Sequence, residues 1–151
     1  MPDCIIVGGG AIGLLTARQL FLEGLDVLLL EQGPLGGESS WAGGGIISPL
    51  YPWRYDASVN QLAERSKKIY PELSRILFEE SGNDCELINS GLFTVIDAGE
   101  VREVTDWAKT WSIDASFIDD AAAVREIEPA AGKAVDKGIW MPDVLQVRNP
   151  K

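Results

Sequence analysis

Histidine is absent from this 151-residue sequence, and cysteine is scarce. Without histidine the chain offers no Ser-His or Cys-His catalytic pair and no histidine-ligated metal site. The two cysteines, Cys4 and Cys85, are 81 positions apart and form no C-x-x-C motif, so a structural zinc site is unsupported. We expect no metal centre, while a disulfide between the two cysteines stays open.

Basic residues and long apolar runs are also in short supply. The sequence has 13 basic and 23 acidic side chains and therefore a net charge of −10, which argues against nucleic acid as the main partner. No apolar run approaches the ~18 residues of a membrane span. The first residues lack a basic region before their apolar stretch, so we expect no secretory signal and a cytoplasmic protein.

Glycine, in contrast, is concentrated at the start, where 11 of the 16 glycines fall within residues 1–45. Two apolar runs, residues 4–7 and 26–31, have the composition of strands buried on both faces. The intervening residues 11–23 have helical apolar spacing, and Gly24 is placed to end that helix. Strand, helix and strand within about 30 residues predict a βαβ unit with parallel strands, hence an α/β fold.

The rest of the chain has a more ordinary pattern. Residues 57–81 are helical in spacing, and Pro71 should kink or divide that helix. Two strands, 86–88 and 92–96, flank Asn-Ser-Gly at 89–91, which predicts a hairpin. Further helices are expected at 101–111 and 121–127, and a strand at 138–141.

The chain stops at a signal for the start of a helix. Asn149 is a favoured N-cap residue, and Pro150 suits the first helical position. Since no helix follows, we expect this sequence to be the truncated front part of a longer protein.

The strongest chemical motif lies between the first strand and the first helix. Residues 8–13 read Gly-Gly-Gly-Ala-Ile-Gly and match G-x-G-x-x-G. Gly8 permits the tight turn, Gly10 allows a pyrophosphate to approach the backbone, and Gly13 lets helix and strand pack closely. The N-terminus of the helix then presents unpaired N–H groups to the phosphates. This arrangement predicts a dinucleotide site, although a glycine-rich turn can match the motif by coincidence.

Glu31 supports the dinucleotide interpretation. It ends the second strand, 18 residues after Gly13, where an acid accepts hydrogen bonds from a ribose diol and repels a 2′-phosphate. NADP is therefore disfavoured. Taken alone, Glu31 could equally be an exposed acid at the end of a strand.

The residues after Glu31 distinguish NAD from FAD. A simple NAD domain would continue into another helix, whereas residues 33–55 are rich in Gly, Ser, Pro and aromatic residues. Ser39, Ser40 and the N–H groups of residues 43–45 could follow a longer ligand through pyrophosphate, ribityl chain and flavin. A mobile linker is the alternative, which Trp41 and the Ile-Ile pair at 46–47 make less attractive.

These motifs together resemble the FAD-dependent D-amino-acid oxidase superfamily. The resemblance rests on G-x-G-x-x-G-x-x-x-A at 8–17, on Glu31, and on Ser-Ser-Trp-Ala-Gly-Gly-Gly-Ile at 39–46. The sequence Ile-Ser-Pro-Leu-Tyr-Pro-Trp-Arg-Tyr at 47–55 is similar to the bacterial glycine oxidase branch of thiamine biosynthesis. So are Ser-Gly-Leu-Phe at 90–93, Ile-Glu-Pro at 127–129 and Gln-Val-Arg-Asn-Pro at 146–150.

The resemblance implies a set of cofactor contacts. It places Ala11 and Ile12 near the pyrophosphate, Glu31 and Gln32 at the adenosine ribose, Ser39 and Ser40 at phosphate or ribityl oxygens, and Gly44, Gly45 and Ile46 along the isoalloxazine ring. The motif glycines Gly8, Gly10 and Gly13 complete the expected cofactor-binding set. Catalytic residues remain unknown, because the family's substrate-binding Arg and Tyr come from later in the chain. Arg54 could instead clamp a substrate carboxylate, but stacking on Trp53 or Tyr55 is favoured.

The resemblance also implies the reaction and the domain plan. A small amine, glycine above all, would lose a hydride from its α-carbon to FAD, giving an imine and, with oxygen, hydrogen peroxide. The plan is a Rossmann-like FAD-binding domain (1–85), part of an α+β substrate domain (86–137) and a return toward the FAD domain (138–151). Partners would be the small amine or amino acid, with a homo-oligomer of the full-length protein left open.

Three rival interpretations remain. The chain could belong to a D-amino-acid dehydrogenase or a sarcosine oxidase, which the choice of electron acceptor and substrate would reveal. It could be an NAD-dependent dehydrogenase, which a bound yellow flavin would exclude. As it stands, it could also be a nucleotide-binding fragment without catalysis.

Overall fold

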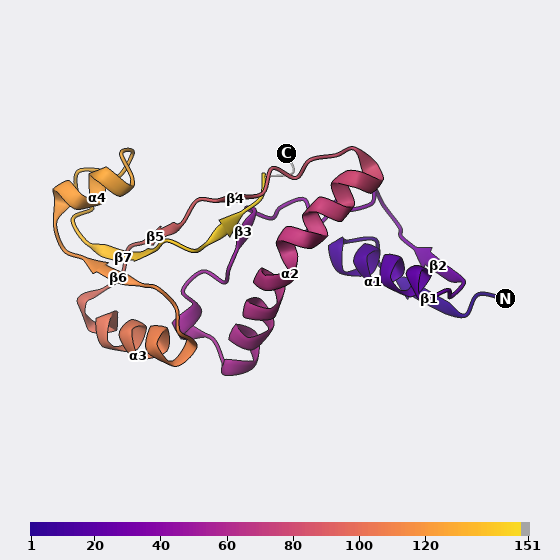
Figure 1. Cartoon of the computed structure of the whole chain (residues 1–151), viewed down its shortest axis with the longest axis horizontal. Helices are drawn as coiled ribbons and strands as arrows, with labels where there is room; N and C mark the ends of the chain where they lie inside the picture. Colours follow the sequence, from indigo (N-terminus) through magenta and orange to yellow (C-terminus); the bar gives the residue numbers. More distant parts are fainter. Residues whose placement is uncertain (149–151) are drawn as a thin grey trace. The chain divides into compact units, whose positions relative to one another are not determined.

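A computed structural model describes residues 1–148, and these form two compact units, Met1–Gly44 and Gly45–Arg148 (Figure 1). The expected helix start at residues 149–150 lies outside the described residues. Within the described residues both cysteines are free, so the disulfide that the sequence left open is not formed. No described helix is both long and apolar enough to cross a membrane.

The first unit is the predicted βαβ element. Strand β1 (Cys4–Val7), helix α1 (Ala11–Leu22) and strand β2 (Val27–Leu30) follow one another, and the strands pair in parallel with Cys4 opposite Val27 and Val7 opposite Leu30. Gly24, at φ +86°, donates its N–H to the carbonyl of Phe21 just beyond the helix. The parallel α/β start and the glycine stop are therefore confirmed.

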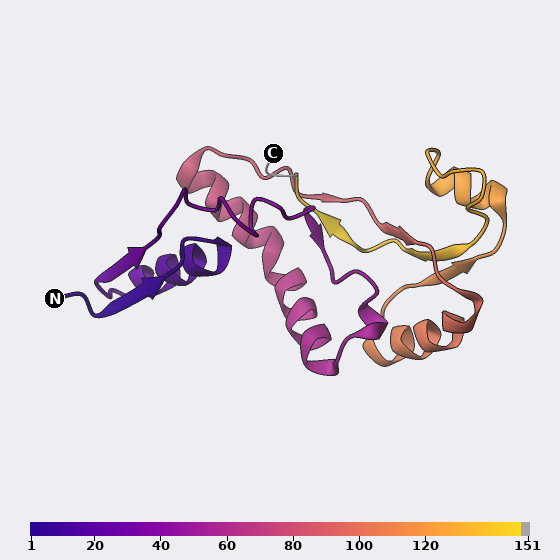
Figure 2. The ribbon, with the colours of Figure 1, turned by 180° about the vertical axis from the view of Figure 1, so that it is seen from behind.

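The second unit is built on two small antiparallel sheets and three helices. One sheet has the order β3 (Ile46–Ile47), β8 (Leu145–Gln146), β4 (Ile88–Asn89), and the other β5 (Leu92–Thr94), β7 (Gly138–Met141), β6 (Ser116–Ile118). Both ribbon views show β7 between its two neighbours (Figure 1 and Figure 2). The helices are α2 (Ala57–Ser81), α3 (Val101–Trp111) and α4 (Ala121–Ile127).

Two local predictions for this unit need correction. The hairpin around residues 89–91 is wrong: β4 pairs with β8 and β5 pairs with β7, while Gly91 donates its N–H to Val144. The chain that returns about 50 to 60 residues later supplies the partners, so the two short strands do not fold back on each other. Of the two outcomes expected at Pro71, division of the helix is wrong, because α2 continues through it to Ser81. A kink at Pro71 stays a prediction.

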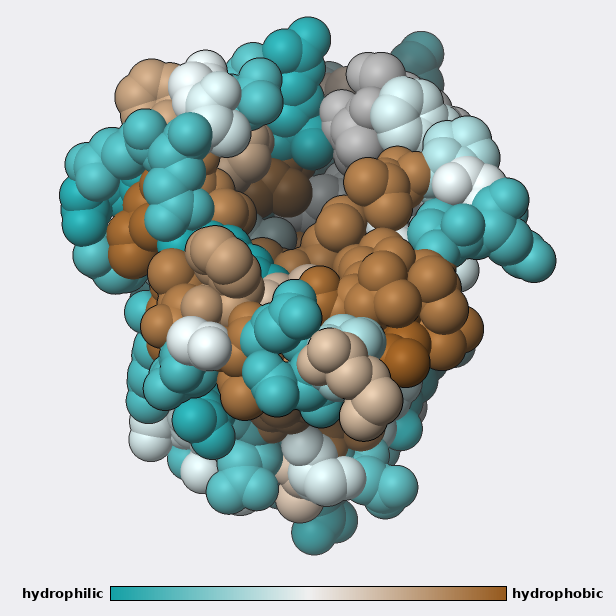
Figure 3. Space-filling view, turned by 90° about the vertical axis from the view of Figure 1, so that its right-hand side faces the viewer, coloured by the Kyte–Doolittle hydropathy of each residue, from teal (hydrophilic) through white to brown (hydrophobic). Residues whose placement is uncertain are grey.

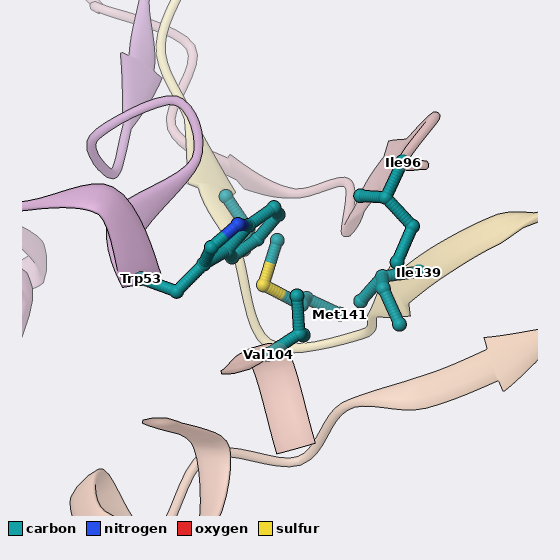
Figure 4. Packing of buried hydrophobic residues seen from close by; sticks show 6 residues of the cluster. Trp53, Ile96, Val104, Ile139 and Met141 are labelled. Atoms are coloured by element: carbon teal, nitrogen blue, oxygen red, sulfur yellow. The ribbon is translucent and has the colours of Figure 1, made fainter. Parts of the chain in front are cut away.

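The core of the second unit lies between β7, α3 and the 3₁₀ turn Pro52–Arg54. Val104 and Met141 are each 1% exposed, and Ile139 is 2% exposed. Figure 4 shows Trp53, from the 3₁₀ turn, directed toward Met141 and Val104. This cluster joins the segment after β3 to α3, which fixes where that segment lies.

The βαβ unit leaves one face of its sheet open. Ile6 faces α1, since a Cβ on Gly13 would lie 3.5 Å from its Cγ2, so alternation turns Ile5 and Val7 away from the helix. Burial on both faces is not reached in the described chain, as expected for a start of only two strands, because no element of this unit covers the second face. Figure 3 shows apolar residues gathered on the face of the chain that it draws.

This open face predicts that residues 1–151 expressed alone will self-associate. Val7 is 83% exposed and Leu30 47%, and apolar patches of a few hundred Å² promote association. We expect gel filtration with light scattering to give oligomers or aggregates, with little bound FAD and no amine oxidation. Val7→Glu should reduce the association, whereas Val95→Glu, at an exposed position in the other unit, should not. A monomeric parent chain that retains flavin would contradict this prediction.

Candidate functional site

The glycine-rich turn joins β1 to α1 and has the backbone geometry the motif predicts. Gly8 has φ +109°, a conformation that other residues rarely adopt, and its N–H donates to Leu30 at 2.8 Å. A Cβ on Gly13 would lie 1.9 Å from the carbonyl oxygen of Gly8, so helix and turn touch at this point. The roles expected for Gly8 and Gly13 in shaping the turn are therefore visible in the backbone.

Glu31 is bound to that turn through its carboxylate. The N–H of Gly9 donates to Oε2 at 2.6 Å, and the N–H of Gly33 donates to Oε1 at 2.8 Å. These backbone hydrogen bonds hold the pKa of Glu31 below its ordinary value of 4.5, and the bond from Gly9 has a larger effect than the bond from Gly33. Glu31 thus fixes the turn to the end of β2 and keeps a negative charge beside it.

The second loop folds back over the start of α1. The N–H of Ala11 donates to Oγ of Ser40 at 2.9 Å, and the N–H of Gly36 donates to the carbonyl of Gly9 at 2.8 Å. Ser40 therefore caps an open N–H at the N-terminus of α1 from 29 residues further along the chain, a position that favours anions.

These elements surround a cavity of about 140 Å³. Gly10 lies at its helix side, and the residues that line it are Gly10, Glu31, Pro34, Gly36, Gly37, Glu38, Ser39 and Ser40. The structure thus gathers four residues of the predicted site, namely Gly10, Glu31, Ser39 and Ser40, at one cavity.

The other predicted site residues lie outside this lining. Ala11 and Ile12 open α1, with Ile12 86% exposed, and Gln32 is exposed beside Glu31. Gly44 ends the first unit, whereas Gly45 and Ile46 belong to the second. Gly45, at φ +82°, is tied to the strand that returns at β8, since the N–H of Val147 donates to its carbonyl at 2.8 Å.

Sequence reasoning missed the contributions of Gly9 and Gly36. A Cβ on Gly9 would lie 2.5 Å from Cδ2 of Leu35 and 3.0 Å from Cβ of Glu31, so a larger residue there would require these side chains to shift. Gly36 has φ +70° and lies on the cavity wall. The signal was present in the sequence, as the middle residue of a Gly-Gly-Gly run and as the Gly-Gly pair at 36–37.

Arg54 is engaged within the second unit. Its Nη2 lies 2.6 Å from Oε1 of Glu100, and its Cζ lies 4.2 Å from the ring centroid of Tyr51. The stacking expected for Arg54 exists, but the ring is Tyr51 and neither Trp53 nor Tyr55 as predicted, because the 3₁₀ turn folds Arg54 back over the residue three positions earlier. The ion pair with Glu100 occupies the guanidinium that a carboxylate clamp would need.

Comparison with known proteins defines the family. Residues 3–151 match the family described as FAD dependent oxidoreductase (DAO). The chain belongs to this family. Its cofactor class is accordingly FAD, and NAD-dependent dehydrogenases are set aside.

Several individual proteins are similar to this chain over almost its whole length. The chain is 44% identical over 149 residues to glycine oxidase of Pseudomonas aeruginosa and 43% identical over 147 residues to glycine oxidase of Pseudomonas putida, covering 97% of this chain in each case. The crystal structure of glycine oxidase from Bacillus cereus superposes with a TM-score of 0.85 at 26% identity, covering 99% of this chain and 41% of that one. The chain spans 40% of the length of each Pseudomonas relative.

The contacts of Glu31 predict how the turn responds to acid. Because the folded-state pKa of Glu31 is depressed, its stabilising contribution is present above the ordinary value of 4.5 and is lost as pH falls through the lower folded value. The amide resonances of Gly9 and Gly33, followed by NMR, should shift together in that acidic range. Glu31→Gln is the matched control and should abolish the shared titration. Amides that titrate at or above pH 4.5 would contradict the prediction.

Proposed function

We propose that this chain carries the FAD-binding region, and part of the substrate region, of an enzyme that oxidises a small amine, with glycine as its substrate. In this proposal residues 1–85 belong to the FAD-binding domain, residues 86–137 to the substrate domain, and residues 138–151 return toward the FAD-binding domain. The 40% span of the glycine oxidases of Pseudomonas supports an enzyme in which further residues complete the active site.

The cavity at the N-terminus of α1 carries the proposal. A dinucleotide brings a negatively charged pyrophosphate and a ribose diol. This cavity offers the start of a helix, two serine hydroxyls and two carboxylates, those of Glu31 and Glu38. Gly10 leaves open the space that a larger side chain would take. The residues present therefore fit the adenosine diphosphate half of FAD.

Each predicted residue then has a proposed role. Glu31 accepts hydrogen bonds from the adenosine ribose, with Gln32 beside it. Gly8, Gly10, Ala11, Ile12 and Gly13 form the pyrophosphate cradle, Ser39 and Ser40 bind phosphate or ribityl oxygens, and Gly44, Gly45 and Ile46 pass the isoalloxazine ring. Since Ser40 already accepts the N–H of Ala11, a phosphate oxygen could take over that N–H while the Ser40 hydroxyl donates to the phosphate.

FAD, when bound, takes up the hydride from the α-carbon of the amine and passes two electrons to oxygen. Glycine loses that hydride and one proton from its nitrogen and becomes the imine, while oxygen gains two electrons and two protons and becomes hydrogen peroxide. No described residue is assigned to catalysis, and the residues of this chain supply binding and orientation. We also propose, from the resemblance alone, that the imine product is used in thiamine biosynthesis.

The test is a flavin spectrum and a peroxide assay on the gene product that contains this chain. We expect a yellow protein that releases hydrogen peroxide from glycine in the presence of oxygen. Sarcosine, D-alanine and a quinone dye serve as alternative substrates and acceptor. Faster turnover with the dye than with oxygen would favour a dehydrogenase, a preference for sarcosine would favour a sarcosine oxidase, and a colourless protein would overturn the FAD proposal.

A further inference from the structure

The 3₁₀ turn after β3 contains a tyrosine in a conformation that tyrosine rarely adopts. Tyr51 has φ +54° and ψ +58°, in the left-handed region, directly before Pro52–Arg54. A residue other than glycine stays in this region only where its surroundings hold it there. The contacts around Tyr51 therefore determine the path of the chain between Ile47 and the start of α2.

One carboxylate, that of Glu100, holds the side chains of this turn. Its Oε1 accepts hydrogen bonds from Nε1 of Trp53 at 3.2 Å and from Nε of Arg54 at 2.7 Å, in addition to the ion pair with Nη2. Its Oε2 accepts from the N–H of Asp97 at 3.2 Å, which fixes the carboxylate at the entrance to α3. The Glu100 side chain is only 17% exposed.

The ring of Tyr51 lies in the space that these contacts define. The guanidinium of Arg54 stacks over it, and the edge of Trp53 meets it with ring centroids 5.6 Å apart at 89°. Since Glu100 orients both Arg54 and Trp53, it holds Tyr51 indirectly from two directions. The same hydrogen bonds, first from Arg54 and then from Trp53, lower the pKa of Glu100.

A second residue, Asn60 of α2, holds the backbone of the turn. Asn60, 4% exposed, donates Nδ2–H to the carbonyl of Pro52 at 3.0 Å and accepts the indole N–H of Trp107 at 3.3 Å. Trp107 and Trp53 also meet, with centroids 6.1 Å apart. The turn is thus fixed by α2 through Asn60 and by the start of α3 through Glu100, whereas Leu50 remains 51% exposed.

We propose that Glu100 is a positioning residue that holds residues 48–55 as one wall of the substrate site. The proposal rests on the proposed function, since it takes Gly45 and Ile46 as the segment along the isoalloxazine ring. Gly45 and Ile46 begin the second unit, and the pairing of β3 with β8 fixes their position there. Residues 48–51 follow β3 directly, so in this proposal they continue from the segment along the ring. Their direction is set by Tyr51, and Tyr51 is held through Glu100.

The test compares Glu100→Gln, Arg54→Met and the double variant in the flavin-loaded gene product. Glu100→Gln keeps the size of the side chain and an acceptor for Trp53, but it removes the charge that orients Arg54. We expect KM for glycine to rise roughly fivefold in each single variant, with no further rise in the double variant, because both act through one contact. The values of kcat and the flavin content should stay close to the parent's, and the near-ultraviolet circular dichroism of the tryptophans should change.

Glu72→Gln is the matched control. Glu72 lies 2.6 Å from Arg75 in an exposed ion pair on α2, away from the turn, and its removal should change neither KM nor the tryptophan signal. An unchanged KM in Glu100→Gln overturns the proposal, and so does a parallel loss of flavin, kcat and stability, which marks a merely structural role. A parent that oxidises no amine contradicts the proposed function instead. In that case the near-ultraviolet circular dichroism of the tryptophans in Glu100→Gln tests the contact, and an unchanged signal overturns the positioning role of Glu100.

Discussion

Gly10→Val is expected to abolish flavin retention while leaving the βαβ unit folded. Gly10 has φ −77° and ψ 179°, a region that valine adopts readily, so the substitution strains no backbone. Its Cβ would lie 3.2 Å from Oγ of Ser40, and its methyl groups would occupy the cavity proposed for the pyrophosphate. The loss should therefore come from the ligand site and not from unfolding.

The measurement is the flavin absorbance per protein after purification, with circular dichroism as the check on folding. Gly99→Val is a matched control, because a Cβ at Gly99 meets nothing within 4 Å and its φ lies outside the left-handed region. Glu31→Ala should weaken flavin retention less than Gly10→Val, since it removes hydrogen-bond acceptors without filling the cavity. If Gly10→Val and Glu31→Ala purify as yellow as the parent, the site assignment is wrong.

Gly13→Ala is expected to disrupt the fold of the first unit itself. The added Cβ would lie 1.9 Å from the carbonyl oxygen of Gly8 and 3.1 Å from its carbonyl carbon. Both are backbone atoms, so no side-chain rotation relieves the contact, and α1 must move away from the turn. We expect a loss of about 3 kcal/mol in the free energy of unfolding of this unit, at the upper end of the range for overpacking.

This loss is measured by denaturant unfolding in which hydrogen exchange of the β1 and β2 amides reports the free energy of unfolding of the first unit. Gly132→Ala is the control, because a Cβ there meets no atom within 4 Å and its φ is not left-handed. The exchange of amides in β7, within the second unit, should remain close to the parent's. Equal protection of β1 and β2 in Gly13→Ala and in the parent would refute the close contact between helix and turn.

Local patterns were sufficient to predict most elements. The apolar runs, the helical spacing and the stop at Gly24 predicted β1, α1 and β2 with their parallel pairing, and the later helices agree with α2, α3 and α4. Predictions failed where strand partners are remote. β4 and β5 each pair with a strand about 50 to 60 residues later in the chain, and this remote pairing outweighs the local turn signal at residues 89–91.

The sequence by itself predicted a dinucleotide site, because a glycine-rich turn, a helix start and an acid after the next strand are local features with fixed spacing. The match to the FAD dependent oxidoreductase family then gave FAD as the cofactor. Only the tertiary structure showed which distant residues contact one another. Ser40 reaches Ala11 across 29 positions, and Glu100 reaches Arg54 across 46. Neither pair has a local signature, because such contacts depend on how packed helices and loops bring distant segments together. The open face of the β1–β2 sheet has the same origin, since a run of apolar residues reports that burial is favourable but not which element covers it.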